Sequence, residues 1–323
     1  MRNNRPQKGG AVPNGAAVRL RSRRTSRLIT SLPYLLMCAP TLIYFLLFHY
    51  LPISGVVIAF KDYNYRSGIF GSPWAGFKYF KYFFESNDAL RVISNTMIYS
   101  VVFHIIGTVA AVLVAVLLYE IVSRKALKYY QTTMMLPYFI SWVLVAYVGF
   151  TLLSSEQGVL NQIIRYFGGE GINWYNEPKY WPVILTSFHV WKNVGQSSIV
   201  YYAALMGVDA GLFEAAKLDG ANRVKQIWHV SLPAITPIIC MMSILAVGQV
   251  MFGNFGLFYQ LPMDSGALYP VTDVIDTYVF RGLQAGNLSQ SAAVGLFQSA
   301  VGFVLVLVTN GVTKKINPDN AMF

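Results

Sequence analysis

Residues 28–60 read LITSLPYLLMCAPTLIYFLLFHYLPISGVVIAF and contain no Asp, Glu, Lys or Arg. About 20 predominantly apolar residues are enough to cross the hydrocarbon core of a bilayer. The stretch is also longer than the apolar region of a signal peptide, roughly 7–15 residues, so we interpret it as a transmembrane helix that is retained. The chain is therefore predicted to be a membrane protein.

Five further stretches of low charge follow this first helix. They are residues 96–119, 129–155 and 180–208, a part of 226–263 and a part of 282–313. The predicted fold class is an all-α membrane protein with six transmembrane helices, because a membrane-crossing helix satisfies all of its own backbone groups. We expect a disordered basic tail at residues 1–27, one six-helix transmembrane domain at 28–315 and a C-terminal end at 316–323.

The composition argues against a water-soluble enzyme. Hydrophobic residues make up 55% of the chain and charged residues 12%, whereas about 25% of a soluble domain is charged. Eight of the 25 basic residues lie in residues 1–27, directly before the apolar stretch. A nucleic-acid-binding domain would combine basic with aromatic residues, so we expect no nucleic-acid partner. Cys38 and Cys240 are far apart and form neither a disulfide framework nor a zinc-binding spacing.

The distribution of basic residues predicts the orientation in the membrane. Sixteen of the 25 Lys and Arg residues fall on the side of the termini, eight fall on the other side, and Lys192 lies within a predicted helix. Cytoplasmic segments carry the excess of basic residues, so both termini and the 206–233 segment are expected in the cytoplasm. The opposite connections, roughly residues 61–94, 156–179 and 259–285, have the composition of ordered loops that contact a partner.

Motifs for catalysis are missing from the chain. It has four histidines without metal-ligand spacing, and it contains no HExxH, GxSxG or GxxxxGK sequence. We therefore expect no enzyme activity, no metal site and no bound nucleotide in this chain. His104 lies within a predicted helix, where a hydrogen bond to a neighbouring helix is the expected role.

The segment between the fourth and fifth predicted helices is the most informative. Residues 208–233 read VDAGLFEAAKLDGANRVKQIWHVSLP. Asp209 is a good helix N-cap, and Gly220 stands where a left-handed residue would end the helix. A second short helix is expected from Asn222 to about Val230, with Pro233 at the entry of the next transmembrane helix.

This segment has two interpretations on composition alone. Its small and apolar residues could fill a groove of another protein, or they could lie on the lipid surface. The small residues are Ala215 and Ala216, and the apolar anchors are Phe213, Val224, Ile227 and Trp228.

One wider pattern in the segment resembles the signature cytoplasmic loop of the membrane subunits of binding-protein-dependent ABC importers. It consists of Glu214-Ala215-Ala216, Gly220, Val230 and Leu232-Pro233, with Val230 where isoleucine is more usual. Other stretches resemble the carbohydrate-uptake branch, and in particular LplB-like permeases for oligosaccharides and polysaccharide fragments. These are residues 47–52 (LFHYLP), 58–63 (IAFKDY), 191–192 (WK), 273–279 (DVIDTYV) and 293–299 (AVGLFQS).

The resemblance implies a type I ABC importer permease in the bacterial cytoplasmic membrane. It implies pairing with a second, homologous permease, cytoplasmic ATP-binding subunits that hold ATP and Mg, and an extracytoplasmic solute-binding protein. The 206–233 segment would then contain the helix that couples the permease to the ATPase. The coupling residues implied are Phe213, Glu214, Ala215, Ala216, Asp219, Gly220, Trp228, Leu232 and Pro233.

Polar side chains within the helices are the candidates for sugar contact, because buried polar groups in a membrane usually line a cavity or bind another helix. The candidates are Lys192, Asn193, Gln196, Tyr201, Gln249 and Asn254. Hydrogen bonding to the second permease is the alternative role. The Lys192 ammonium could serve an acidic sugar such as a uronate, or its stem could extend to the membrane surface.

An ion-coupled secondary sugar transporter is the alternative function. Such a carrier would show an inverted repeat and a carboxylate within the membrane. We find no such repeat, and all 14 acidic residues lie in loops or at helix ends.

Overall fold

The computed structural model describes residues 33–34 and 36–316. The chain divides into two units, residues 1–56 and residues 57–323, and each is described by itself. The predicted basic tail at residues 1–27 and the last residues, 317–323, lie outside the described residues.

An apolar helix, Leu36–Phe60, makes up most of the described part of the first unit and continues into the second. It passes through a π-helical turn, Leu46–Tyr50, in which the Leu51 N–H donates to the carbonyl of Leu46, and ends in a 3-10 helix, Leu51–Phe60. Pro52 follows the π turn, and a proline ring crowds the carbonyl four residues earlier, which a wider turn relieves. The first predicted transmembrane helix is confirmed from residue 36 onward.

The second unit is helical, and its described residues pair in extended form at one bridge, Lys61 to Trp74. In chain order its helices are α2 Gly68–Gly71, α3 Lys78–Phe84, α4 Asn87–Tyr119, α5 Arg124–Phe139, α6 Trp142–Leu153, α7 Val159–Tyr166, α8 Trp181–Met206, α9 Ala210–Leu218, α10 Arg223–Gln226, α11 Leu232–Gly248, α12 Phe255–Gln260, α13 Tyr269–Thr272, α14 Ile275–Gln284 and α15 Leu288–Ile316.

The predicted number of transmembrane helices agrees with the structure when two bent pairs are each counted once. Among the described residues, four helices are long and apolar enough to cross a membrane, and the two bent pairs, α5 with α6 and α8 with α9, bring the number to six. The third predicted helix, residues 129–155, is not continuous, because α5 and α6 meet at a bend of 97°.

The break between α5 and α6 has a local cause. Pro137 lies inside the last turn of α5 and has no N–H to continue the helical ladder. Ser141 then starts α6, and its Oγ accepts from the Leu144 N–H at 3.4 Å. A helix that ends within a membrane leaves its last carbonyls without partners unless another group supplies donors.

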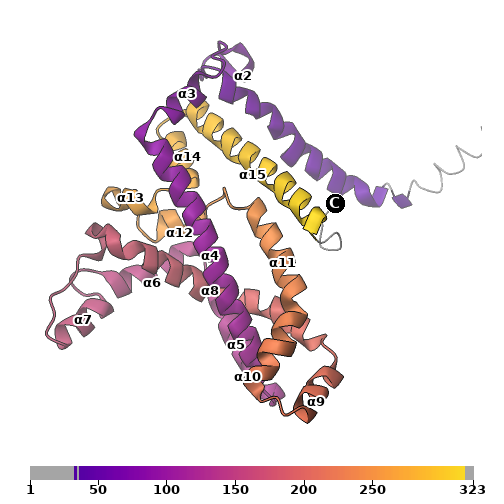
Figure 1. Cartoon of the computed structure of the whole chain (residues 1–323). Coiled ribbons are helices and arrows are strands. Elements are labelled where there is room, and N and C mark those ends of the chain that lie inside the picture. The colour runs from indigo at the N-terminus through magenta and orange to yellow at the C-terminus, as the bar shows by residue number, and fades with distance from the viewer. Residues whose placement is uncertain (1–32, 35, 317–323) are drawn as a thin grey trace, which may run out of the picture. The chain divides into compact units, whose positions relative to one another are not determined.

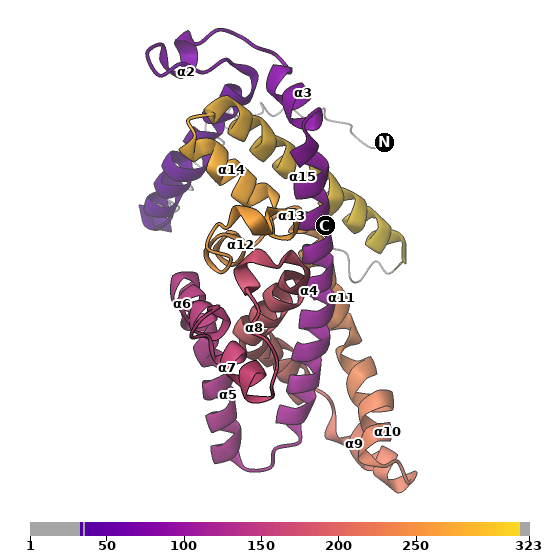
Figure 2. The same ribbon diagram turned by 90° about the vertical axis from the view of Figure 1, so that its left-hand side faces the viewer.

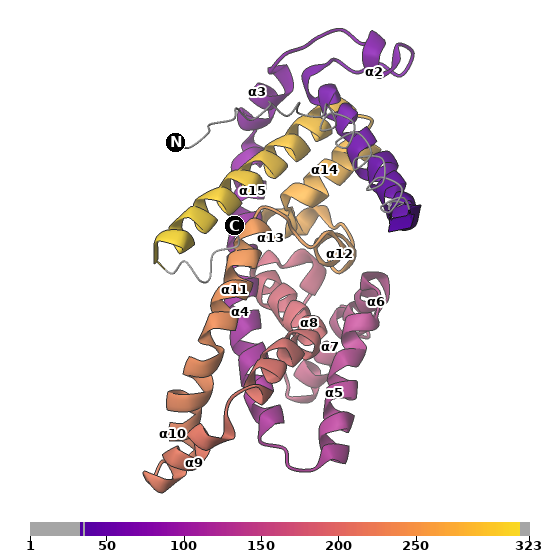
Figure 3. The same cartoon turned by 90° about the vertical axis from the view of Figure 1, so that its right-hand side faces the viewer.

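Helix α4 is the axis along which the second unit is arranged. Figures 1 and 2 show α3 and α14 near its first residues and α9 and α10 near its last, with α8 alongside it. Three buried clusters follow one another along α4, around Val92, then Tyr99 and Phe103, then Ala111 and Ala115. Figure 3 shows α11 running from α10 toward α15. Lipid is as apolar as the side chains of these helices, so the hydrophobic effect does not drive the helices together within a membrane. Close packing of their side chains holds them together instead.

A polar contact fixes the connection that precedes α3. The Asp62 carboxylate accepts from the Tyr79 hydroxyl at 2.6 Å and from the Lys78 ammonium at 3.2 Å. The hydrogen bond from Tyr79, followed by that from Lys78, lowers the pKa of Asp62. The Tyr63 N–H donates to Ser289 Oγ at 2.9 Å, which attaches this connection to the start of α15.

Candidate functional site

The 206–233 segment connects α8 to α11. Helix α8 ends at Met206, and α9 follows after a bend of 72°. Asp209 caps α9, since its Oδ1 accepts from the Gly211 N–H at 2.9 Å. The predicted N-cap is therefore confirmed.

Helix α9 ends as predicted at a left-handed glycine. Gly220 has φ of 77°, its N–H donates to Lys217 at 3.0 Å, and the Ala221 N–H donates to Ala216 at 2.9 Å. This pair of bonds is a Schellman motif, in which glycine takes a conformation that a side chain would strain.

The second helix of the segment is longer than predicted. It begins at the expected cap, where Asn222 Oδ1 accepts from the Lys225 N–H at 2.9 Å. It does not end near Val230, because α10, a π-helical turn at Ile227–Ser231 and α11 form one helix, Arg223–Gly248. Pro233 follows this π turn just as Pro52 follows the first one, so the wider turn again relieves the clash of a proline ring.

The apolar anchors of the segment are partly different from those predicted. Val224 and Trp228 are exposed, at 60% and 65%. Phe213 instead packs against Tyr119 of α4, with ring centroids 5.7 Å apart, and Ile227 packs against a buried cluster. Leu218, 89% exposed, was not predicted.

The remaining predicted residues of the segment lie on two sides of it. Glu214, Ala215, Asp219 and Pro233 are exposed, whereas Ala216 and Leu232 are half-buried. The Glu214 carboxylate makes no hydrogen bond or ion pair with any described residue. The exposed face therefore combines a free carboxylate with Leu212, Leu218, Val224 and Trp228.

The second site is a cavity of about 430 Å³ between α4, α8, α11 and the residues before and within α12. Its polar lining forms two stripes with a spacing of four residues, so each stripe follows one face of a helix. On α4 the stripe is Thr96, Ser100, His104 and Thr108, and on α8 it is His189, Asn193, Ser197 and Tyr201. Gln249 and Asn254 complete the polar lining.

Hydrogen bonds and aromatic contacts order this lining. His104 Nε2 lies 2.9 Å from Ser243 Oγ on α11, which confirms its predicted contact between helices. His189 stacks on Phe103 with centroids 4.2 Å apart. Asn193 Nδ2 donates to the carbonyl of His189 at 2.8 Å, and Asn254 Oδ1 caps α12 by accepting from Leu257 N–H at 3.2 Å.

Four of the six predicted cavity residues line the cavity and two do not. Asn193, Tyr201, Gln249 and Asn254 line it. Lys192 and Gln196 are not among its lining residues, because one residue along a helix turns a side chain by about 100°. The α4 stripe was missed, although its spacing of four residues is visible in the sequence.

Lys192 lies at the contact between α8 and the end of α5, not at the cavity. It is 6% exposed, and its Nζ donates to the carbonyls of Pro137 at 3.0 Å and Tyr138 at 2.9 Å and to that of Ile140. An ammonium has three donors, and all three are used by the last carbonyls of α5. Those carbonyls also carry the negative end of the helix dipole. The ammonium lies 5.2 Å from the ring centroid of Trp142 at the start of α6.

A glycine lets α8 approach α5 closely beside this contact. A Cβ built on Gly195 would lie 1.9 Å from the carbonyl oxygen of Met134. Gly195 is three residues from Lys192, so both lie on the face of α8 that meets α5. Lys192 and Gly195 therefore fasten the broken helix pair to α8, and the sequence did not predict this role. Membrane-spanning helices around a polar cavity, with an exposed helix-turn segment beyond one of them, are the arrangement expected of a membrane transport protein.

The comparisons with known proteins identify the family. A family model described as "Binding-protein-dependent transport system inner membrane component" matches residues 105–320. The chain belongs to this family, and it is a permease subunit of an ABC importer. It is 39% identical over 301 residues, 93% of each chain, to the polygalacturonan/rhamnogalacturonan transport system permease protein YteP of Bacillus subtilis (strain 168). It is 37% identical to Protein LplB of the same organism, over 88% of this chain and 89% of that one.

A solved structure has the same fold. It is the crystal structure of a bacterial ABC transporter involved in the import of the acidic polysaccharide alginate, with 33% identity and a TM-score of 0.83. The match covers 91% of this chain and 99% of that chain. A second structure shows the alginate transporter in complex with an alginate pentasaccharide-bound periplasmic protein, with a TM-score of 0.81, 32% identity and coverage of 90% and 97%.

Proposed function

We propose that this chain imports an oligosaccharide fragment of a polysaccharide, driven by ATP that separate subunits bind and hydrolyse. Its partners are a second homologous permease, two ATP-binding subunits and an extracytoplasmic solute-binding protein. The chain spans the bacterial cytoplasmic membrane with its termini and the 206–233 segment in the cytoplasm. The carbohydrate-related names of its relatives and the alginate-bound periplasmic protein in the related complex support this proposal.

One observation carries the proposal. Helix α8 lines the cavity with residues 189–201 and leads through a single bend into α9 of the 206–233 segment. A displacement of α9 by an ATPase subunit would therefore move one wall of the cavity directly. Through this connection, ATP binding by the partner subunit would be coupled to the opening of the cavity to one side of the membrane and then the other.

The cavity lining favours a carbohydrate as substrate. Hydroxyl, amide and imidazole groups alternate with the rings of Tyr99, Phe103 and Phe258, and sugars present both hydroxyl groups and apolar faces to such linings. The described residues that line the cavity include no Asp, Glu, Lys or Arg. An ion-coupled carrier would use a carboxylate at its site.

A charge reversal at Glu214 tests the proposed function. We expect Glu214→Arg to lower recovery of the ATPase subunit with the solubilised chain by about tenfold or more, ~1.4 kcal/mol, because a reversed charge would face the partner's surface. Stimulation of ATP hydrolysis by the sugar-loaded binding protein should fall with it. Both quantities are measured by co-purification from native membranes and by phosphate release.

Glu170→Arg is the matched control, since Glu170 is also exposed but lies between α7 and α8. It should leave recovery of the ATPase subunit unchanged. Equal recovery of the ATPase with both variants would contradict contact at the 206–233 segment. A parent chain that recovers no ATPase and no second permease would contradict the importer assignment itself.

A further inference from the structure

A second polar pocket, of about 480 Å³, lies at the end of α4 that is remote from the 206–233 segment. The first turn of α4, helices α13 and α14 and the first residues of α15 form it. Its lining is Asp88, Arg91, Tyr269, Asp273, Tyr278, Arg281, Gly282, Ala285, Asn287, Gln290 and Ser291. It shares no lining residue with the cavity. We call it the outer pocket, because the proposed orientation puts it on the extracytoplasmic side.

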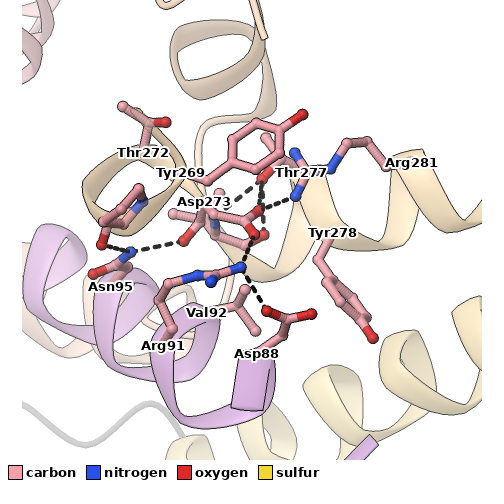
Figure 4. Close-up of polar contacts among 12 residues, drawn as sticks. Asp88, Arg91, Val92, Asn95, Tyr269, Thr272, Asp273, Thr277, Tyr278 and Arg281 are labelled. Carbon is pink, nitrogen blue, oxygen red and sulfur yellow. Dashed lines mark hydrogen bonds and ion pairs between the residues drawn. The ribbon is translucent and has the colours of Figure 1, made fainter. Parts of the chain in front are cut away.

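A buried carboxylate holds the wall of the outer pocket rigid. Asp273 is 1% exposed, and its carboxylate accepts from Arg91 at 3.0 Å, from the Thr277 hydroxyl at 2.9 Å and from Arg281. Figure 4 shows the two guanidinium groups converging on Asp273 from α4 and α14. The wall is therefore formed before any ligand arrives, which lowers the entropy that binding costs.

One turn of chain separates this wall from the cavity. The Thr96 hydroxyl accepts from the Ile275 N–H at 2.9 Å, and Thr96 itself lines the cavity. Asn95 Nδ2 donates to the carbonyl of Asp273 at 2.9 Å. The outer pocket and the cavity thus lie in sequence along α4, with the buried residues Thr96, Asp273 and Ile275 between them.

Several groups that line the outer pocket have unused hydrogen-bonding capacity. Arg91 Nε is buried and has no partner among the described residues. Gln290 Nε2 donates to the Tyr278 hydroxyl at 2.7 Å, which leaves the hydroxyl proton and Gln290 Oε1 for a ligand. Burial raises the pKa of Tyr278, so the hydroxyl keeps that proton. The Asn287 side chain makes no hydrogen bond with a described residue and also lines this pocket.

The charges and rings of the outer pocket select the ligand class. Two guanidinium groups face three carboxylates, since Arg91 pairs with Asp88 at 2.8 Å and with Asp273, and Arg281 pairs with Asp273 and with Asp264 at 3.3 Å. An anionic ligand therefore gains no net attraction, because every guanidinium group is already paired and the carboxylates outnumber them. Neutral hydroxyl groups can use the free donors and acceptors, and the tyrosine rings offer apolar faces.

We propose that the outer pocket binds a neutral sugar ring of the transported oligosaccharide, with Arg91, Tyr278, Asn287 and Gln290 contacting its hydroxyl groups. This inference rests on the proposed function. It assigns the chain a second carbohydrate contact, outward of the cavity, that receives the substrate before the cavity does.

Sugar binding to the intact transport complex in nanodiscs, without the binding protein, tests this inference. The probe is cellobiose at millimolar concentration, followed by saturation-transfer difference NMR, and digalacturonate serves as the acidic comparison. The Asn287→Ala/Gln290→Leu double variant should lower the cellobiose signal at least several-fold, whereas Gln284→Leu, an exposed residue of α14 outside the pocket, should leave it unchanged. The thermal unfolding midpoint of each variant shows whether the complex is intact.

Three outcomes would overturn the outer pocket as a sugar site. They are no cellobiose signal with the parent, a signal lost in Asn193→Leu of the cavity but retained in the double variant, or digalacturonate binding in place of cellobiose. None of these affects the Glu214 experiment, so failure of the outer pocket remains distinguishable from failure of the proposed function.

Discussion

Replacing Lys192 with methionine is expected to destabilise the chain by about 3 kcal/mol. Methionine keeps most of the length of the side chain and removes the three donors that reach the carbonyls at the end of α5. Each of the three hydrogen bonds from the charged ammonium contributes on the order of 2 kcal/mol, and removal of an ammonium from the membrane returns about 3 kcal/mol. The loss of donors therefore outweighs the relief of desolvation.

Equilibrium unfolding in mixed detergent micelles measures this effect. Lys192→Arg should show an intermediate loss, because a planar guanidinium cannot direct three donors at three converging carbonyls as an ammonium does. Lys179→Met is the control, since the Lys179 side chain is 65% exposed and makes an ion pair with Glu177 at the surface. An exposed pair of this kind contributes about 0–1 kcal/mol.

The same variants separate a structural role of Lys192 from a sugar contact. With the ammonium satisfied by α5, the apparent KM for substrate should stay unchanged in any variant that still assembles. Unfolding midpoints that are equal for Lys192→Met and Lys179→Met would remove the proposed role at the end of α5. A raised KM with unchanged stability would restore the hypothesis of a uronate contact.

The sequence alone was sufficient to predict the features that depend on the membrane or on neighbouring residues in the chain. Long uncharged stretches predicted the transmembrane helices, because a bilayer leaves few other structures for them. Asp209 and Gly220 predicted the ends of α9, because capping depends on residues close together in the chain. The break between α5 and α6 was not predicted, although Pro137 marks it locally. The donors that satisfy the carbonyls exposed by the break come from Lys192, which lies more than fifty residues later in the chain.

The cavity was predicted in part, for a reason of helical geometry. Lys192 and Gln196 were placed together on one face of the fourth helix, but the cavity lies on the neighbouring face, which carries His189, Asn193, Ser197 and Tyr201. The prediction gave weight to the charge of Lys192, and the face of α8 that carries Lys192 meets α5 instead of the cavity. The regular spacing of polar residues in residues 96–108 and 189–201 was the better signal, because it follows one face over three turns.

Gly195→Ala is expected to have a comparable effect on the same contact between α5 and α8. The added Cβ would lie 1.9 Å from the Met134 carbonyl oxygen and 2.4 Å from its carbon, where van der Waals contact requires more than 3 Å. Both groups are backbone atoms, so a rotamer change cannot relieve the clash and the helices must move apart. We expect a loss of about 3 kcal/mol, at the upper end for overpacking.

Gly295→Ala is the control for this variant, because Gly295 lies within α15 and a Cβ there meets no atom within 4 Å. Alanine in a helix interior is favoured over glycine by about 1 kcal/mol, so this change should be neutral or stabilising. Equal stability of Gly195→Ala and the parent would contradict the close approach of α8 to α5.

The combined variant, Gly195→Ala with Lys192→Met, tests whether the two residues act on one contact. Separating α8 from α5 at Gly195 also moves the ammonium away from the carbonyls of Pro137 and Tyr138. Gly195→Ala therefore already weakens the hydrogen bonds that Lys192→Met removes. The loss of unfolding free energy in the double variant should be smaller than the sum of the losses in the two single variants. Additive losses would mean that Lys192 and Gly195 stabilise the chain independently.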